Sequence, residues 1–126
     1  MRASAFEAVT LADYSGAELF GRFCASCHGQ SGRGDGPVAR SLTTRVPDLT
    51  RIARRYGEFP DGRIRETIDG RSAIAAHGSR LMPIWGYEFW VAEGGDAVAR
   101  REMYTLIGKL VDHLRSLQRE PKGPRD

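Results

Sequence analysis

The chain has 126 residues, of which 40% are hydrophobic and 28% charged, and its formal net charge is +3. This length fits one compact domain around a single core, and no uninterrupted apolar run approaches the roughly 18 residues of a membrane-spanning helix. The composition therefore excludes a transmembrane segment in this chain, and it disfavours nucleic-acid binding, because the basic residues form no run and do not alternate with stacking aromatic residues.

We divide the chain into an N-terminal extension over residues 1–13, a single domain over 14–118 and a C-terminal tail over 119–126. The extension lacks the basic start and the apolar stretch of a secretory signal, so it does not reveal a compartment. At the start of the domain, Ser15 and Glu18 form a capping-box pattern, in which both side chains satisfy backbone donors at a helix start.

This start predicts a helix over 16–27 whose apolar side chains recur at spacings of three and four, the period of one helical face. They are Phe20, Phe23, Cys24 and Cys27. The segment CASCHG at 24–29 closes this helix. The glycine-rich stretch 29–37 cannot continue it, and we expect a long loop over 29–60.

Two more helices follow along the chain. Asp61 can cap a short helix that carries Ile64 and Ile68 on one side and ends at Gly70. The strongest periodic pattern covers 96–118 and predicts a long helix with one buried stripe. The stripe consists of Met103, Ile107, Leu110, Leu114 and Leu117. No alternating strand pattern of useful length appears, so we expect an all-α fold with long loops.

Positive charge is concentrated in the middle of the chain. Residues 33–80 contain ten arginine residues and six acidic residues, a net charge of +4. Arg33, Arg40 and Arg45 belong to this segment. The pattern predicts a docking surface for an acidic protein partner, and ordinary solvated surface is the alternative.

The segment CASCHG has the spacing of a cofactor attachment site. At about 100° per residue, Cys24 and His28 lie about 40° apart around a helix, and Cys27 lies about 60° from Cys24 on the other side. Two such thiols can each form a thioether with one porphyrin while the imidazole reaches the iron, which is the attachment pattern of c-type haem. The alternatives are a redox dithiol, a structural zinc site with His77 and His113 as further ligands, and a chance occurrence without a cofactor.

The second axial ligand would decide what such a haem does. Haem iron with one protein ligand binds gases or peroxide, whereas iron with two strong ligands mainly carries electrons. The candidates are Met82, Met103, His77 and His113. Met103 and His113 belong to the predicted last helix, where core packing or a local contact is the usual role. Met82 precedes Pro83, which favours extended backbone and a loop that presents one thioether, and a buried loop methionine is the alternative.

Four motifs in order resemble a class I monohaem cytochrome c over residues 14–118. They are CASCHG at 24–29, VPDLT at 46–50, HGSRLMPIWG at 77–86 and LIGKLVDHLRSL at 106–117. The resemblance implies a cytochrome c fold, in which three or more helices and long loops wrap around one covalently attached haem c. It also implies His and Met as the two axial ligands of the haem iron.

Position by position, the resemblance implies that Cys24 and Cys27 hold the haem, that His28 is the proximal iron ligand and that Met82 is the distal one. It further implies that the backbone carbonyl of Pro47 accepts the Nδ1–H of His28. Such a hydrogen bond fixes the orientation of the ring and makes it a stronger donor to the metal.

Three positions bear on how the helices pack. Gly16 and Phe20 match the positions at which the first helix of the family crosses the last, near Leu110. Where that last helix commonly has an aromatic residue, this chain has His113, so we expect a hydrogen bond instead of a ring contact at the crossing.

Segment 87–95, YEFWVAEGG, is longer and more aromatic than its counterpart in small family members. We expect it to pack locally over the haem edge, and a partner-binding surface is the alternative.

The function implied by the resemblance is electron transfer without enzymatic activity. Its partners would be redox proteins that dock transiently, for example an acidic oxidase, reductase or dehydrogenase. The main alternative is a haem protein with a labile sixth site that acts as a peroxidase or gas sensor, and a zinc-stabilised interaction module is a third class. Because haem is attached to CxxCH outside the reducing cytoplasm, the resemblance also implies a bacterial periplasm or a similar compartment.

Overall fold

The computed structural model describes residues 10–70 and 82–119. Within these residues the chain forms helices and turns and contains no strand. In chain order the elements, with η for a 3-10 helix, are η1 (Leu11–Asp13), α2 (Gly16–Phe23), α3 (Ala25–His28), η2 (Ala39–Ser41), η3 (Leu49–Arg51), α4 (Ile52–Tyr56), α5 (Asp61–Asp69), α7 (Trp85–Ala92) and α8 (Ala97–Ser116). The all-α prediction is confirmed. None of the helices in this described part combines the length and apolar character that a membrane crossing requires.

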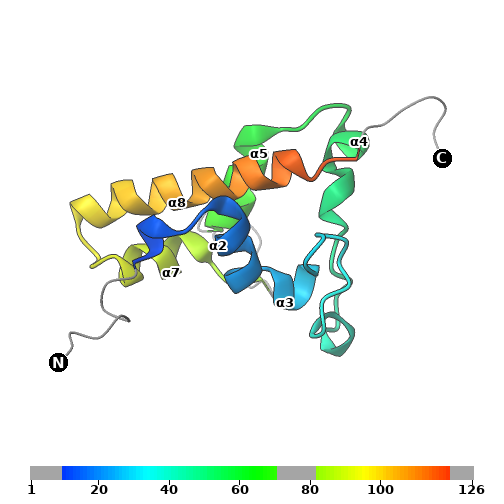
Figure 1. The fold of residues 1–126 in the computed structure, drawn as a ribbon, viewed down its shortest axis with the longest axis horizontal. Helices are drawn as coiled ribbons and strands as arrows, with labels where there is room; N and C mark the ends of the chain where they lie inside the picture. Colours follow the sequence, from blue (N-terminus) through cyan, green and yellow to red (C-terminus); the bar gives the residue numbers. More distant parts are fainter. Residues whose placement is uncertain (1–9, 71–81, 120–126) are drawn as a thin grey trace.

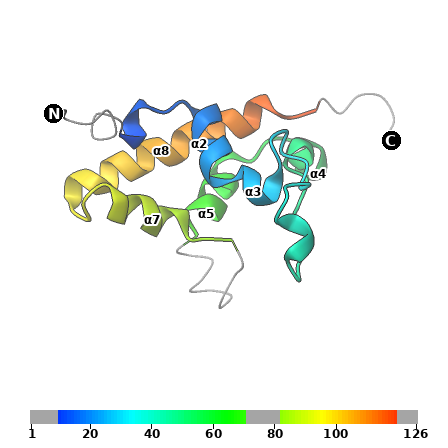
Figure 2. The ribbon, with the colours of Figure 1, turned by 60° about the horizontal axis from the view of Figure 1, so that its bottom comes forward.

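The long helix α8 organises the molecule. Helices α2, α5 and α7 all pack against it, and α7 forms an antiparallel hairpin with it at one end (Figure 1). The short helices α3 and α4 lie toward the other end of the molecule in both ribbon views (Figures 1 and 2). The CASCHG segment at 24–29 thus lies between the α2 crossing and the loops around α4.

The predicted start of α2 is confirmed in detail. The backbone N–H of Glu18 donates to Ser15 Oγ at 3.1 Å, and the backbone N–H of Ser15 donates to Glu18 Oε1 at 2.8 Å. This reciprocal pair satisfies two of the backbone donors that a helix start leaves open. The capping box therefore sets the residue at which α2 begins.

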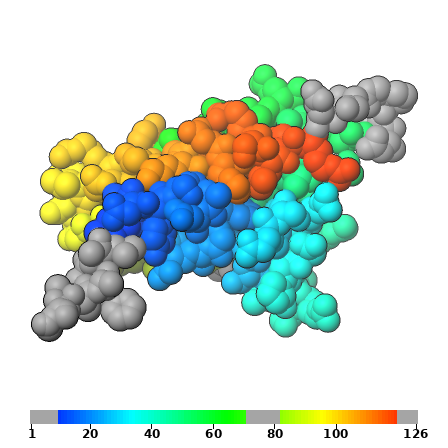
Figure 3. Space-filling model, in the orientation of Figure 1, coloured from blue at the N-terminus to red at the C-terminus, as the bar shows by residue number. Residues whose placement is uncertain are grey.

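The crossing of α2 and α8 depends on a glycine, as expected. A methyl group on Gly16 would overlap the carbonyl oxygen of Lys109 and lie 3.1 Å from the Cβ of His113. In the space-filling view the side chains of α2 lie directly against those of α8 (Figure 3). The rings of Phe20 and His113 are in contact, with centroids 5.2 Å apart. The expected hydrogen bond in place of a ring contact was therefore wrong, because an imidazole is itself a flat ring that packs against Phe20.

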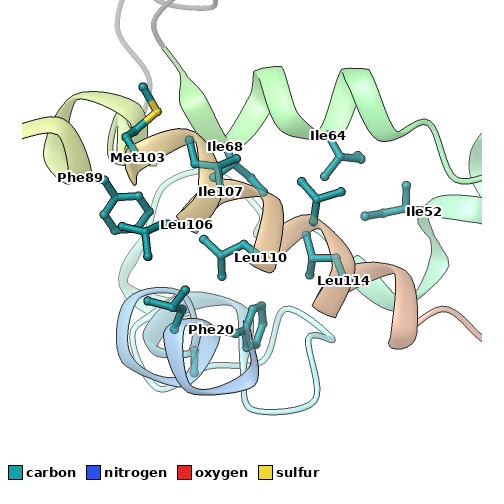
Figure 4. Close-up of a cluster of buried hydrophobic side chains, with 13 residues drawn as sticks. Phe20, Ile52, Ile64, Ile68, Phe89, Met103, Leu106, Ile107, Leu110 and Leu114 are labelled. Carbon is teal, nitrogen blue, oxygen red and sulfur yellow. The ribbon is translucent and has the colours of Figure 1, made fainter. Parts of the chain in front are cut away.

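Side chains from four helices converge on the buried stripe of α8. Six residues of that helix between Met103 and Leu114 are at most 5% exposed. They are Met103, Leu106, Ile107, Leu110, Val111 and Leu114. Phe20 from α2, Ile52 from α4, Ile64 and Ile68 from α5 and Phe89 from α7 point toward this stripe (Figure 4). The predicted stripe is confirmed, and Leu117 at its end is half-buried.

Several predicted boundaries differ from the structure. The helix expected over 16–27 is divided at Cys24 into α2 and α3. The loop expected over 29–60 contains η2, η3 and the five-residue helix α4. Most of segment 87–95, for which the sequence predicts no helix, belongs to α7. The helical pieces within 29–60 are too short, and α7 is too uniformly apolar, to show a period in sequence. The division at Cys24 has another reason, which is that no glycine or proline marks it.

Helix α5 has nearly the predicted bounds, with one difference at its start. Asp61 does not cap this helix, because Pro60 occupies the capping position and Asp61 is the first helical residue. Its carboxylate forms an ion pair with Arg115 of α8. Gly70 ends the helix in the left-handed conformation at φ 82°, as the sequence predicts.

Candidate functional site

Cys24 lies at a bend between α2 and α3. Its backbone angles are φ −117° and ψ −29°, away from regular helix values. Cys24 nevertheless takes part in the hydrogen bonding of both helices, because its N–H donates to the Phe20 carbonyl and its carbonyl accepts from the N–H of His28, both at 2.9 Å. The helical spacing of Cys24, Cys27 and His28 is therefore retained although the helix is not continuous.

The two cysteines are free thiols in a half-buried position. The pKa of Cys24 is raised to about 12, mainly by burial and to a smaller extent by the charge of the neighbouring Cys27 thiolate. A dithiol that acts by nucleophilic exchange needs a lowered thiol pKa, because the thiolate is the reactive form. These surroundings therefore suit a thiol that is consumed in a covalent bond to an apolar group better than a redox dithiol.

His28 is buried at 9% exposure and has an unsatisfied ring nitrogen. Burial lowers its pKa, and the backbone carbonyl of Pro47 acts in the opposite direction. That carbonyl therefore interacts with the imidazole, but the pair falls short of hydrogen-bond geometry, and Nδ1 makes no hydrogen bond. A neutral imidazole is the form that binds a metal, and a small movement would let Nδ1–H donate to Pro47.

A glycine-rich turn holds the Pro47 segment beside the histidine. The N–H of Gly34 donates to the His28 carbonyl at 2.7 Å, and the N–H of Leu49 donates to the Gly32 carbonyl at 2.6 Å. Gly34 has φ +88°, and a methyl group there would lie 2.5 Å from the Val46 carbonyl oxygen and 3.0 Å from that of Pro47. Only glycine combines this backbone angle with so close an approach.

Polar contacts that the sequence analysis missed fix the far side of the same turn. Asp48 accepts hydrogen bonds from the backbone N–H of Thr50 at 2.8 Å and from its hydroxyl at 2.6 Å. Burial acts to raise the pKa of Asp48, but these two hydrogen bonds and the charges of Arg51 and Arg55 outweigh it and lower the pKa. The Asp-Leu-Thr pattern, which is typical of an Asx turn, is the signal that could have revealed this contact.

The end of α8 also holds this segment. Gln118 Nε2 donates to the Leu49 carbonyl at 2.7 Å, and Gln118 Oε1 accepts from the Ala53 N–H at 2.9 Å. Gln118, two residues beyond the end of α8, therefore helps to set where the Leu49 to Ala53 region lies. No local sequence pattern predicts this contact, because its two residues are 69 positions apart.

An aromatic cluster that the sequence analysis also missed adjoins the first cysteine. Phe23 directly precedes Cys24, and its ring lies 5.3 Å from the rings of both Trp85 and Phe89 in α7. Trp85 and Phe89 stack on each other at 5.6 Å. These rings form an apolar wall between the attachment motif and α7, which is the kind of surface that a porphyrin edge contacts.

The candidates for the second axial ligand differ in their surroundings. Met82 is half-buried and packs against the core cluster, and it begins the described segment that leads into α7. Met103 is 2% exposed among the core side chains of α8, and His113 packs on Phe20, so both are engaged in helix packing. His77 lies outside the described residues. Two thiols, a neutral imidazole and a thioether are a donor set that fits haem c.

Comparison with known proteins identifies the family of the chain. The family model described as Cytochrome c matches residues 15–87, which is more than half of the chain. No curated protein and no solved structure matches the chain. Cytochromes c carry a covalent haem, and Cys24 and Cys27 provide the CxxCH motif for it. The chain therefore belongs to the cytochrome c family and is a haem-binding protein of electron transport.

Proposed function

We propose that this protein carries single electrons between redox proteins, with His28 and Met82 as the two axial ligands of its haem iron. The observation that carries the proposal is the buried imidazole of His28, with its unsatisfied Nδ1, directly after the two free thiols of the CxxCH motif. The bound haem supplies a one-electron couple between Fe(II) and Fe(III). The protein residues hold this couple in place and set its ligands.

Each residue of the attachment motif has a separate task in this proposal. The thiols of Cys24 and Cys27, both half-buried, form the two thioether bonds. His28 supplies its Nε2 as a ligand, and the Pro47 carbonyl accepts the Nδ1–H. That hydrogen bond would orient the ring and raise its donor strength. The close approach of Gly34 to this segment supports the role, since a side chain at Gly34 would collide with the Val46 carbonyl and crowd that of Pro47.

Met82 is proposed as the distal ligand because the other methionine of the described part that could compete, Met103, is enclosed in the core. Met82 instead packs at the edge of the core cluster, next to the exposed Pro83. A thioether opposite an imidazole raises the reduction potential relative to a second imidazole. Two strong ligands also leave no open position for a gas or peroxide, which favours electron transfer over peroxidase chemistry.

The proposed partners include an acidic redox protein that docks transiently on the arginine-rich segment. Arg33, Arg40 and Arg45 are all exposed. An exposed set of like charges guides an oppositely charged protein and raises the rate of encounter. We also propose a periplasmic or similar location, since covalent haem attachment to CxxCH requires thiols outside the reducing cytoplasm.

The binding of small ligands tests the proposed function. The reduced protein should not bind carbon monoxide rapidly at neutral pH, and the oxidised protein should show a low-spin spectrum that hydrogen peroxide leaves unchanged, because Met82 occupies the sixth position. Met82→Ala is the matched variant that should bind carbon monoxide quickly. Fast binding by the unaltered protein, together with a high-spin spectrum, would instead indicate an open sixth site and a peroxidase or gas sensor.

A further inference from the structure

Helix α7 is apolar on both of its faces. Its sequence from Trp85 to Ala92 contains one charged residue, Glu88. Phe89 on the inner face is 1% exposed, whereas Tyr87 and Val91 on the outer face are 51% and 49% exposed. A surface helix of a protein that works alone is usually polar on its outer face. The outer face of α7 therefore has the composition of a contact surface.

Tyr87, Trp90 and Val91 form one apolar patch, which we call the α7 patch. Tyr87 and Val91 lie one turn apart, and the rings of Tyr87 and Trp90 are in contact at 6.1 Å. Trp90 Nε1 donates to the Asp96 carbonyl at 3.1 Å. The Gly95 N–H donates to the Trp90 carbonyl at 2.9 Å. The turn between α7 and α8 therefore fixes Trp90, so ordering this side chain on binding costs little conformational entropy.

The segment that carries the α7 patch is acidic, and the first basic residues after it are Arg100 and Arg101 in α8. Glu88, Glu93 and Asp96 are the charged residues between 82 and 99, a segment without lysine or arginine. Glu88 and Asp96 are exposed, and none of the three forms an ion pair with a residue of the described part. An apolar centre with an acidic rim is complementary to a partner with an apolar contact area and a rim of lysine or arginine.

The α7 patch is connected to the haem-attachment motif through the inner face of the same helix. Trp85 and Phe89 contact Phe23 at 5.3 Å, and Phe23 is bonded to Cys24. A helix with its side chains is about 10–12 Å across. A protein bound on the outer face of α7 would thus be separated from this aromatic wall by the thickness of one helix.

We propose that the α7 patch is a docking site for a second redox partner, a protein with a basic rim around an apolar contact area. The inference rests on the proposed electron-transfer function and adds a partner of opposite charge. Segment 33–45, with its exposed arginines, and the turn between α7 and α8 lie at opposite ends of the molecule (Figures 1 and 2). An acidic and a basic partner can therefore be held at the same time, one at each end.

Outer-sphere oxidants of defined charge test this inference on the reduced holoprotein. Tris(phenanthroline)cobalt(III) combines a positive charge with flat apolar ligands, and it takes one electron from haem Fe(II) to give Fe(III) and Co(II). Glu88→Gln/Glu93→Gln should slow this oxidation about three- to tenfold at low ionic strength, because the two carboxylates attract the cation. Glu58→Gln/Glu66→Gln is the matched control, with the same change in net charge on exposed residues of another region.

The apolar part of the α7 patch is tested separately with Tyr87→Ser/Val91→Ser. These changes should lower the rate of oxidation by the phenanthroline complex. The rate of oxidation by hexaamminecobalt(III), a cation of the same charge without apolar ligands, should stay the same. Equal rates in both glutamine double variants, or no effect of the serine variant on the phenanthroline complex, would overturn the proposal. Self-association of the unaltered protein that Glu88→Gln/Glu93→Gln abolishes would assign the patch to a second copy and also overturn it.

Oxidation by an anion distinguishes failure of the α7 docking site from failure of the proposed electron-transfer function. Hexacyanoferrate(III) is an anion, and it should oxidise every one of these variants at the rate of the unaltered protein. If it does so while the cobalt complexes show no dependence on the α7 patch, electron transfer stands and the docking site is wrong. If the unaltered protein exchanges electrons with neither the anion nor the cations, the electron-transfer function fails and the docking site fails with it.

Discussion

At the scale of single residues, the position of Pro47 beside His28 results from several unrelated contacts. Asp48 holds Thr50 in a tight turn, and Gln118 reaches from the end of α8 to the backbone of the same segment. The spacing of CxxCH reveals two attachment cysteines and one histidine without further help. The part played by Pro47 followed only from the family resemblance, and Gln118 left no sequence signal because its contact spans 69 positions.

Removal of both thiols tests the covalent attachment. Cys24→Ala/Cys27→Ala should not retain haem in denaturing electrophoresis, since no thioether bond can form. We also expect the double variant to fold poorly, because haem supplies part of the apolar core of a cytochrome c. Met82→Ala is the control and should keep its haem stain, because it leaves both thiols intact. A stained band in the double variant would contradict covalent attachment at these two cysteines.

At the scale of elements, the crossing of α2 and α8 holds the attachment motif against the core. Gly16 allows the close approach at the start of α2, and Phe20 packs on His113 one turn later. Lys109 Nζ adds hydrogen bonds to the carbonyls of Ala12 at 2.9 Å and Tyr14 at 2.8 Å. The crossing therefore joins the N-terminal part of the domain to the last helix before the chain enters the haem motif.

A methyl group at this crossing should force the two helices apart. Gly16→Ala should lower the free energy of unfolding of the holoprotein by about 1–3 kcal/mol, the usual cost of overpacking. Gly62→Ala is the matched control, because a methyl group on Gly62 would meet no atom within 4 Å and alanine favours a helix by up to about 1 kcal/mol. Urea unfolding measures both variants, and equal stability of the two would show that the crossing tolerates a wider separation.

His113 should make the stability of the crossing depend on pH. Burial lowers the pKa of His113 in the folded protein, whereas the unfolded chain keeps a value of about 6.5. The unfolded state therefore binds the proton first, so stability is complete above about pH 6.5 and falls as the pH decreases toward the folded pKa. His113→Phe keeps a ring against Phe20 and should flatten this fall. Unfolding experiments from neutral to mildly acidic pH measure this loss of stability. If His113→Phe loses as much stability as the unaltered protein, another group is responsible for the pH dependence.

The helices differ in how far the sequence predicts them. The stripe of α8 and the capping box of α2 are predicted because they combine several local signals. Helix α4 is only five residues long, and α7 has apolar residues on both faces with Glu88 as its one charged residue, so neither shows a helical period. The bend at Cys24 also has no local signal, since no glycine or proline stands there. The aromatic wall was not predicted, because it needs Phe23 of α2 beside two rings of α7.

At the scale of the whole molecule, charge is distributed along the long axis. The exposed arginine residues of segment 33–45 lie at one end, and the acidic turn between α7 and α8 lies at the other (Figure 1). The net charge of +3 conceals this arrangement. An electron carrier with such a distribution can distinguish its donor from its acceptor by the sign of their charges.

The arginine-rich end should attract an anionic reactant. Oxidation of the reduced protein by hexacyanoferrate(III) should become slower as ionic strength rises toward ~0.15 M, where the Debye length is about 8 Å. Arg40→Gln/Arg45→Gln should reduce both the rate and its dependence on salt. Arg100→Gln/Arg101→Gln is the matched control on exposed residues of α8. A rate that does not change with salt, or an equal effect of the two double variants, would remove the role of this segment.

The axial ligation by Met82 is the claim on which the electron-transfer account depends, and near-infrared absorption of the oxidised protein tests it most directly. A methionine sulfur bound to ferric haem gives a weak sulfur-to-iron charge-transfer band at the edge of the near infrared. We predict this band in the unaltered protein and in Met103→Leu, and its loss in Met82→Ala together with a lower reduction potential. Absence of the band from the unaltered protein, or its persistence in Met82→Ala, would contradict the account.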